Sequence, residues 1–223
     1  MVNNCGIILS FDDTHVNEWF ALKDFFKSNK IKATFYPIIS TLEKEDWEKL
    51  RELQFEGHIV GHHGFNHLRA GEIDMDIDDA RRKDKIKYYG QTGWINFLNN
   101  EINAGLNEMR KNEINCNHYA YPYGNRNENS DLILLKIFKT LRGGDLQNYN
   151  LNETPRVIYS VDFGKNPLSR YSGHEQSIIR TLQSNKIICL HSHIPIIMSR
   201  LSWLVEIINS FGGEFFTPEV IKI

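Results

Sequence analysis

Short apolar runs alternate with helix-periodic segments along most of the 223 residues, and this alternation restricts the possible folds more than any other feature. Strands that alternate with helices predict βαβ units and therefore parallel strands. We predict strands over 6–11, 32–37, 58–61, 118–121, 141–144, 156–161, 186–190 and 214–217. Helices are predicted over 15–28, 44–55, 94–111, 129–140, 174–184 and 200–211, and segment 69–93 has no clear pattern. Seven or eight strands in this length favour a closed α/β barrel over an open sheet.

The bulk composition predicts one globular domain over residues 1–223, because no linker, repeat or low-complexity tract interrupts the chain. The hydrophobic content of 41% and the charged content of 24% are ordinary for globular proteins, and a net charge of −2 gives no reason to expect a nucleic-acid partner or an anionic membrane. No basic leader with an apolar core is visible, and no apolar run reaches the roughly 18 residues of a spanning helix. The three cysteines lack CxxC spacing. We therefore expect a cytoplasmic protein without a transmembrane segment; the sequence makes no prediction of oligomeric state.

Metal-ligand residue types stand at the ends of the predicted strands. Asp12 and Asp13 close the first run, His63 and His67 follow the run around Val60, and His191 ends the run 187–190. Strand ends are where barrels and open α/β sheets build their sites. Carboxylate and imidazole ligands with an open position are typical of a catalytic metal. The sequence therefore predicts metal-assisted hydrolysis.

Each of these residues also has a simpler interpretation. Asp13 stands just before a predicted helix and could cap it, since Asp accepts backbone N–H bonds there. His63 and His67 have the i, i+4 spacing that brings two side chains to one side of a helical turn, but they could also belong to a histidine-rich polar loop.

Two later segments carry similar double interpretations. The sequence Tyr121-Pro122-Tyr123-Gly124 predicts a rigid turn whose Tyr123 N–H could bind a developing oxyanion, or an ordinary turn. His191 could act as a general acid, or as a structural residue. His193 follows two residues later, so either imidazole of this pair could take the role.

The order of these elements along the chain resembles the polysaccharide deacetylases of carbohydrate esterase family four. The resemblance spans residues 6–217. It is carried by Phe11-Asp12-Asp13, by Lys32-Ala33-Thr34-Phe35-Tyr36, by Gly57-His58-Ile59-Val60-Gly61-His62-His63 with His67, by Glu101-Ile102, by Tyr119-Ala120-Tyr121-Pro122-Tyr123-Gly124 and by Leu190-His191.

This resemblance implies a distorted (β/α) barrel that removes acetyl groups from N-acetyl sugars with the help of zinc. It implies that Asp13, His63 and His67 bind the metal and that Asp12 is the base that deprotonates the attacking water. The same resemblance implies an oxyanion site at the Tyr123 N–H beside Pro122. It makes His191 the acid for the leaving amine and places Leu190 in the pocket for the acetyl methyl group.

The chain departs from this family at two supporting positions. Many members carry an Arg in the third motif, hydrogen-bonded to the base, where this sequence has Ala120. Arg142 and Arg156 are candidate replacements on later strands. The fourth motif, an acidic and aromatic element that orients the catalytic His, has no clear match, and Asp145 and Asp162 are the nearest acidic candidates.

The leading hypothesis is thus a metal-dependent deacetylase acting on an N-acetylated sugar or glycoconjugate. Nucleotide- or lipid-linked sugars are favoured as substrates, since no leader is visible. Zinc is the expected metal, and cobalt, nickel or iron also suits imidazole and carboxylate ligands. One alternative is hydrolysis of a C–N bond in a small cyclic amide or ureide on the same fold. The other is an inactive barrel that binds glycans, favoured by the missing Arg and fourth motif.

Overall fold

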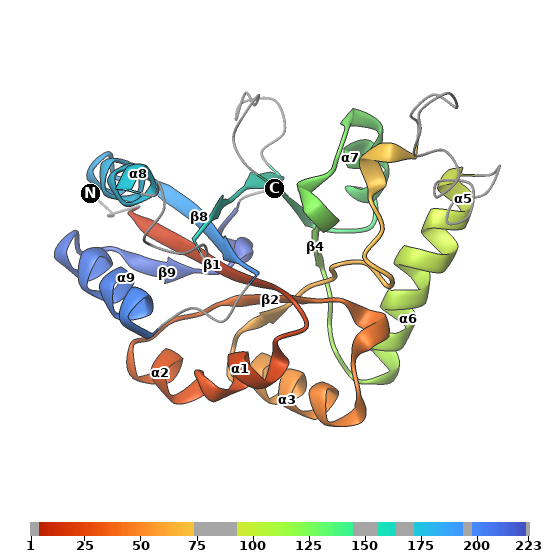
Figure 1. Cartoon of the computed structure of the whole chain (residues 1–223), viewed down its shortest axis with the longest axis horizontal. Coiled ribbons are helices and arrows are strands. Elements are labelled where there is room, and N and C mark those ends of the chain that lie inside the picture. Colours follow the sequence, from red (N-terminus) through yellow and green to blue (C-terminus); the bar gives the residue numbers. More distant parts are fainter. Residues whose placement is uncertain (1–4, 74–92, 145–155, 164–171, 194–197, 222–223) are drawn as a thin grey trace.

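The computed structural model describes residues 5–73, 93–144, 156–163, 172–193 and 198–221. Within this part of the chain the paired strands are parallel and form two groups (Figure 1). The first group has the order β3-β2-β1-β8-β7, and β9 also pairs with β1. It consists of β1 (Gly6–Asp13), β2 (Thr34–Pro37), β3 (Ile59–Val60), β7 (Val161–Asp162), β8 (Ile187–Ser192) and β9 (Glu214–Phe216). The second group has the order β4-β5-β6 and consists of β4 (His118–Ala120), β5 (Thr140–Gly143) and β6 (Val157–Tyr159).

The two groups of strands meet at both of their ends. A parallel bridge between His62 and Tyr119 joins the end of β3 to β4, and only Ser160 separates β6 from β7. The strand β9 pairs with Gly6–Ile8 of β1, whereas β2 pairs with its second half from Ser10 onward. If β6 and β7 are counted as one bent strand, the described strands make a ring of seven with β9 as an eighth. The predicted distorted α/β barrel is confirmed.

Helices precede β2, β3, β4, β5, β8 and β9, in line with the alternation that the sequence predicted (Figure 1). They are α1 (Val16–Ala21), α2 (Lys23–Ser28), α3 (Lys44–Phe55), α5 (Gly93–Phe97), α6 (Ala104–Lys111), α7 (Glu128–Leu134), α8 (Ser172–Gln183) and α9 (Met198–Ser210). Short 3₁₀ turns add η1 (Ile39–Thr41), η2 (Ala70–Glu72), η4 (Pro122–Gly124) and η5 (Pro218–Val220). The predicted helix 15–28 is divided at Leu22. The predicted helix 94–111 contains a π-helical segment, η3 (Leu98–Asn103).

The two-residue period of the strands decides which side chains reach the barrel interior. Along β1, Ile7, Leu9 and Phe11 belong to the main hydrophobic cluster, which also contains side chains from α1, α3, α8 and α9. The intervening Ser10 and Asp12 are buried on the opposite face. The strand thus brings a carboxylate into the barrel while its alternate residues stabilise the outer layers.

The structure leaves some predictions as they stand. The single-domain organisation and the cytoplasmic location stay predictions. Residues 74–92, which cover most of the unclear segment 69–93, lie outside the described residues, as does Asp145. No helix in the described part of the chain has the length and apolar character needed to cross a membrane.

Candidate functional site

Three side chains, one from the end of β1 and two from the loop after β3, converge on one point. Asp13 Oδ1 lies 3.6 Å from His63 Nε2 and 3.6 Å from His67 Nε2, and the two Nε2 atoms are 3.1 Å apart. Asp13 Oδ1 is buried and accepts no hydrogen bond from the described residues. Ligands of a tetrahedral metal at 2.0–2.2 Å stand about 3.3–3.6 Å from one another. The side chains present therefore fit a zinc-like cation.

The two imidazoles meet by a different route from the one that their spacing suggested. Residues 63–67 form an irregular loop, so the expected helical turn is wrong. His67 instead has a left-handed backbone with φ of 63°, and Asp13 at the end of β1 has φ of 75°. Such conformations cost about 1–3 kcal/mol for non-glycine residues and concentrate at functional sites. Asp13 does not cap α1, whose N-cap residue is His15.

The protonation states of this group suit metal binding. His63 Nδ1 lies 2.9 Å from the carbonyl of Ala120, so this nitrogen donates its proton and Nε2 keeps a lone pair toward Asp13. Burial lowers the pKa of His63 well below its usual value and also lowers that of His67. Burial raises the pKa of Asp13, against the opposing attraction of His193. A cation would relieve the cost of this partly buried carboxylate.

Asp12 lies next to the triad but faces the barrel interior, with a side chain that is 1% exposed. One of its oxygens, Oδ2, pairs with Arg142 from β5. The other, Oδ1, is buried and has no hydrogen-bond partner among the described residues. A buried carboxylate with one oxygen held and one available can accept a proton from a neighbouring group.

Arg142 occupies a position equivalent to the missing third-motif Arg on the neighbouring strand. Its Cα is the register partner of Ala120 in the parallel pairing of β4 and β5. Parallel register partners point to the same face, so the guanidinium of Arg142 enters the barrel beside the small Ala120 side chain. Besides Asp12, it donates to Ser160 Oγ at 2.9 Å and lies 5.3 Å from the ring centroid of Tyr36.

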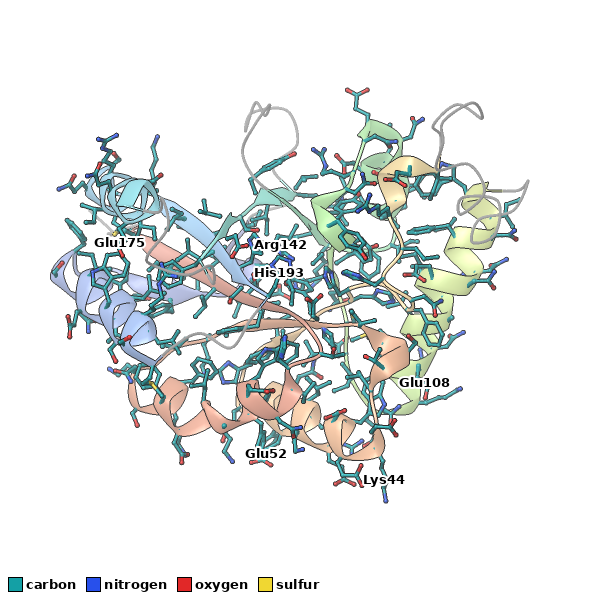
Figure 2. The ribbon with its side chains drawn as sticks, viewed as in Figure 1. Lys44, Glu52, Glu108, Arg142, Glu175 and His193 are labelled. Carbon is teal, nitrogen blue, oxygen red and sulfur yellow. The ribbon has the colours of Figure 1, made fainter. Side chains whose placement is uncertain are left out.

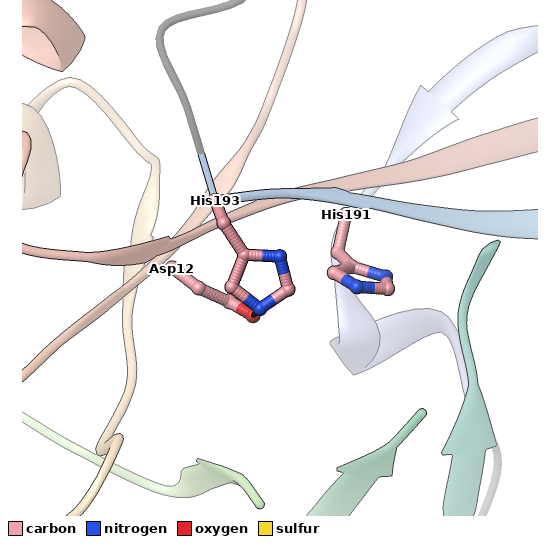
Figure 3. Close-up of side chains that lie close together, drawn as sticks. All are labelled: Asp12, His191 and His193. Carbon is pink, nitrogen blue, oxygen red and sulfur yellow. Dashed lines mark ion pairs between the residues drawn. The ribbon is translucent and has the colours of Figure 1, made fainter. Parts of the chain in front are cut away.

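Two histidines of β8 and the loop after it complete the interior group. Ser160 Oγ lies 2.9 Å from His191 Nδ1, which links His191 to Arg142 through one hydroxyl. His193 Nε2 lies 3.6 Å from Asp12 Oδ2, and its Nδ1 lies 3.7 Å from Asp162 Oδ2. Figure 3 shows His193 against Asp12, with His191 beside it, and Figure 2 shows His193 near Arg142.

The pKa values of the two histidines are shifted in opposite directions. Burial and the neighbouring Arg142 lower the pKa of His191 to about 3, so its imidazole is neutral. Asp162 raises the pKa of His193, with Asp12 adding to this effect against partial burial. His193 therefore holds a proton at higher pH than His191 does, and its side chain is 40% exposed.

A cavity of about 300 Å³ opens beside this group. Its lining residues are Asp12, Tyr121, Tyr123, Gly124, Arg142, Gly144, Asp162, His191 and His193. The turn η4 forms one wall; Pro122 is buried, and Tyr123 has φ of 60°. The Tyr123 ring lies 4.5 Å from the His67 ring and 4.2 Å from the Arg69 guanidinium. The two hydrogen bonds of this turn are donated by Gly124 and Asn125, so neither uses the Tyr123 N–H.

Comparison with known proteins identifies the family. The family model described as polysaccharide deacetylase matches residues 3–137, more than half of the chain. This chain belongs to the polysaccharide deacetylase family. No curated protein sequence matches the chain.

Solved structures show the same deacetylase fold at low sequence identity. The chitin deacetylase of the fungal pathogen Colletotrichum lindemuthianum is 15% identical, with a TM-score of 0.57 over 95% of this chain and 84% of that chain. A CE4 esterase of Streptococcus mutans is 16% identical, with a TM-score of 0.56 over 96% and 86%. The catalytic domain of a peptidoglycan N-acetylglucosamine deacetylase from Eubacterium rectale is 17% identical, with a TM-score of 0.54 over 95% and 87%.

The family match ends before β5, so it covers the metal-ligand triad and η4 but none of the later site residues. Of the predicted supporting residues beyond this point, Arg142 and Asp162 lie in the site. Arg156 does not, because its guanidinium donates to the carbonyls of Leu135, Phe138 and Lys139.

Leu190 also lies outside the pocket that the family resemblance implied for it. Its side chain is fully buried in the main hydrophobic cluster with Ile188, on the face of β8 that packs outward. The alternation of side chains along a strand places Cys189 and His191 on the other face. Since His191 lines the cavity, Leu190 cannot line it as well.

Two polar residues of the site, Ser160 and Tyr36, were not predicted as functional. Ser160 lies in no motif, and Tyr36 lies in a segment that resembles the family but had no role assigned to it. Only the pairing of strands reveals their contacts with Arg142. The sequence offered His193 as an alternative to His191, because it stands two residues later, a spacing that keeps two side chains of a strand on one face.

Proposed function

We propose that this member of the polysaccharide deacetylase family hydrolyses the acetamide of an N-acetylated sugar or glycoconjugate with the help of a divalent metal. One observation carries the proposal: Asp13, His63 and His67 present three ligand atoms 3.1–3.6 Å apart beside the unbonded Oδ1 of the buried Asp12. A ligand triad next to a base is the arrangement that metal-assisted hydrolysis requires.

In this proposal Asp13, His63 and His67 hold the metal. A divalent cation there supplies Lewis acidity, which polarises the acetamide carbonyl and makes water easier to deprotonate. Asp12 Oδ1 accepts the proton of the attacking water, while Arg142 holds Oδ2 and fixes the carboxylate plane. The Tyr123 N–H donates to the oxygen of the acetyl group as negative charge develops on it.

The leaving amine needs a proton, and we assign its delivery to the pair His191 and His193. His191 is the predicted donor, and the link through Ser160 to Arg142 holds its ring. His193 is the member whose pKa is raised, because Asp162 and Asp12 face its two nitrogens. Once His193 has given its proton to the leaving amine, its neutral imidazole can take up the proton held by Asp12, whose Oδ2 lies 3.6 Å from His193 Nε2.

Two comparisons guide the choice of substrates to test. Two of the similar structures are named a chitin deacetylase and a peptidoglycan N-acetylglucosamine deacetylase. Oligomers of N-acetylglucosamine are therefore the first substrates to test, followed by nucleotide- and lipid-linked N-acetyl sugars.

The deciding experiment measures acetate release from this panel. We expect release with Zn²⁺, loss of activity after chelation, and recovery when Zn²⁺ or Co²⁺ is returned. Acetate release that survives full removal of metal would contradict the proposal. Turnover of cyclic amides or ureides without any acetate release would support the alternative hydrolase, and glycan binding without turnover at high protein concentration would support the binding barrel.

The role of His193 predicts a specific pH dependence. Its pKa is raised, so the protonated form is present below that pKa and is lost as the pH rises through it. Activity should therefore fall on the alkaline side, and His193→Gln should remove this fall and lower kcat by about 10²-fold or more, since general acids contribute 10²–10⁴-fold.

A comparison with His191→Gln separates the two imidazoles. If His191 alone delivers the proton, His193→Gln keeps the alkaline fall and most of the activity. The measurement is kcat against pH for the wild type and both variants, with metal content determined at each pH so that loss of metal is not mistaken for titration of His193.

A further inference from the structure

Glu101 is a fully buried carboxylate that the proposed reaction does not use. It has no exposed surface and lies in the π-helical segment η3, which precedes α6. A carboxylate is costly to bury unless hydrogen bonds or charges compensate for it. Its described partners show where that compensation comes from.

All of the described hydrogen bonds to Glu101 come from the loop that carries His67. Oε2 accepts from the backbone N–H of Asn66 at 2.8 Å and from its side-chain amide at 3.3 Å. Oε1 accepts from the backbone N–H of Leu68 at 2.8 Å. The two backbone donors are the residues directly before and after His67. Glu101 therefore holds the chain on both sides of a metal-ligand residue.

The backbone between these two donors needs such support. His67 has φ of 63°, a left-handed conformation that costs a non-glycine residue about 1–3 kcal/mol. Gly64 at the start of the loop has φ of 83°, and a Cβ atom there would lie 2.4 Å from Glu101 Oε1. His62 Nδ1 accepts the Gly64 N–H at 2.9 Å and holds the other end of the loop. The carboxylate fits the space that the glycine leaves open.

The π-helical segment accounts for how Glu101 reaches the loop. A π turn holds one residue more than an α turn. This extra residue rotates the helix face of the preceding residues by about 100°. Glu101 and Ile102 are both buried, and Ile102 packs in the second hydrophobic cluster with Tyr119 and Tyr121. The helix is thus anchored to β4 and directs the carboxylate toward the loop, whose irregular path beside α6 is visible in Figure 1.

We propose that Glu101 is a positioning residue that sets the left-handed backbone of His67, and so holds its imidazole beside His63 and Asp13 in readiness for the metal. This inference rests on the metal site of the proposed function. Glu101 does not line the cavity, and the hydrogen bonds that it accepts come from the backbone of this loop and from the Asn66 amide, so it acts through the loop alone.

The test is the metal affinity of Glu101→Gln. Glutamine keeps the shape but replaces one acceptor oxygen with an NH₂ group, which then faces a backbone N–H. Partners outside the ligand set typically change metal affinity 10- to 100-fold. We expect Zn²⁺ to bind 10- to 100-fold more weakly in a competition with a chromophoric chelator, and the visible absorption spectrum of the Co²⁺ protein to change. The unfolding free energy of the metal-free Glu101→Gln protein is measured in parallel.

Two further variants make the result decisive. Glu108→Gln is the matched control, because Glu108 lies on the same helix but pairs with Lys111 at the surface; its Zn²⁺ affinity should equal that of the wild type. Gly64→Ala disturbs the same contact from the loop side and should also weaken Zn²⁺ binding. It provides the answer if Glu101→Gln does not fold.

The outcomes separate this inference from the proposed function. If the wild type binds Zn²⁺ tightly and both Glu101→Gln and Gly64→Ala bind it equally well, the role of Glu101 is wrong and the metal site stands. An equal loss of affinity in Glu108→Gln would also overturn it. If the wild type binds no Zn²⁺, Co²⁺, Ni²⁺ or Fe²⁺, both the inference and the proposed metal-dependent function fail.

Discussion

Asp12→Asn is expected to lower kcat for acetate release by about 10²–10⁴-fold, the usual contribution of a general base. The amide has nearly the same shape as the carboxylate but cannot accept the proton of the attacking water. Asp13, His63 and His67 remain in place, so the variant should still bind Zn²⁺. Acetate release and metal content are measured on the same preparation.

The stability of Asp12→Asn must be followed too, because the substitution leaves the buried guanidinium of Arg142 without its anion. Breaking a buried ion pair costs about 3–5 kcal/mol, so the unfolding free energy should fall while the protein remains folded at low temperature. Asp24→Asn on the surface of α2 serves as the control for the loss of a carboxylate. Near-normal activity in a folded, metal-loaded Asp12→Asn protein would show that another group is the base.

Replacing Arg142 is the second change with a large expected effect. Arg142→Ala removes the cation beside Asp12 and the donor to Ser160. The unfolding free energy should fall by about 3–5 kcal/mol, and kcat/KM should fall by at least about 10- to 100-fold because the base and His191 both lose their support. Denaturant unfolding and acetate release measure the two effects. Arg142→Lys should recover part of the stability but not the double contact, since an ammonium lacks the planar fork of a guanidinium.

The register of β4 and β5 permits a stricter test of this role. Ala120 and Arg142 are register partners and point to the same face, so the double variant Ala120→Arg with Arg142→Ala exchanges their side chains with little change in total volume. If the guanidinium matters only through its place beside Asp12, the exchanged protein should regain activity that Arg142→Ala has lost. A folded double variant with no recovery would mean that Arg142 has a task specific to β5, such as its contact with Ser160.

Much of the site could be predicted because its signals are local. The apolar run 6–11 predicts a strand, and the two carboxylates that follow it lie at the strand end by necessity. The two-residue period then separates them, with Asp12 inside the barrel and Asp13 at its rim. The order of motifs predicted the family, and the family match confirms it.

The failures have equally physical causes. The i, i+4 spacing of His63 and His67 suggested a helical turn, but a left-handed His67 held by a distant carboxylate brings the rings together instead. Arg156 was as good a candidate as Arg142 by sequence, yet its guanidinium binds helix-end carbonyls. Leu190 is the neighbour of His191 on the same strand. Because side chains alternate between the two faces of a strand, Leu190 points away from the cavity.

The sequence by itself determined the barrel, the position of each strand and the residue types of the metal triad, because hydrophobic period and strand-end chemistry are read from neighbouring residues. Only the tertiary structure decided which distant groups support them. Arg142 reaches Asp12 across 130 residues, and Glu101 reaches the His67 loop across more than 30. Such contacts depend on strand register and helix orientation. These are set by packing of the whole molecule, and no local pattern encodes them.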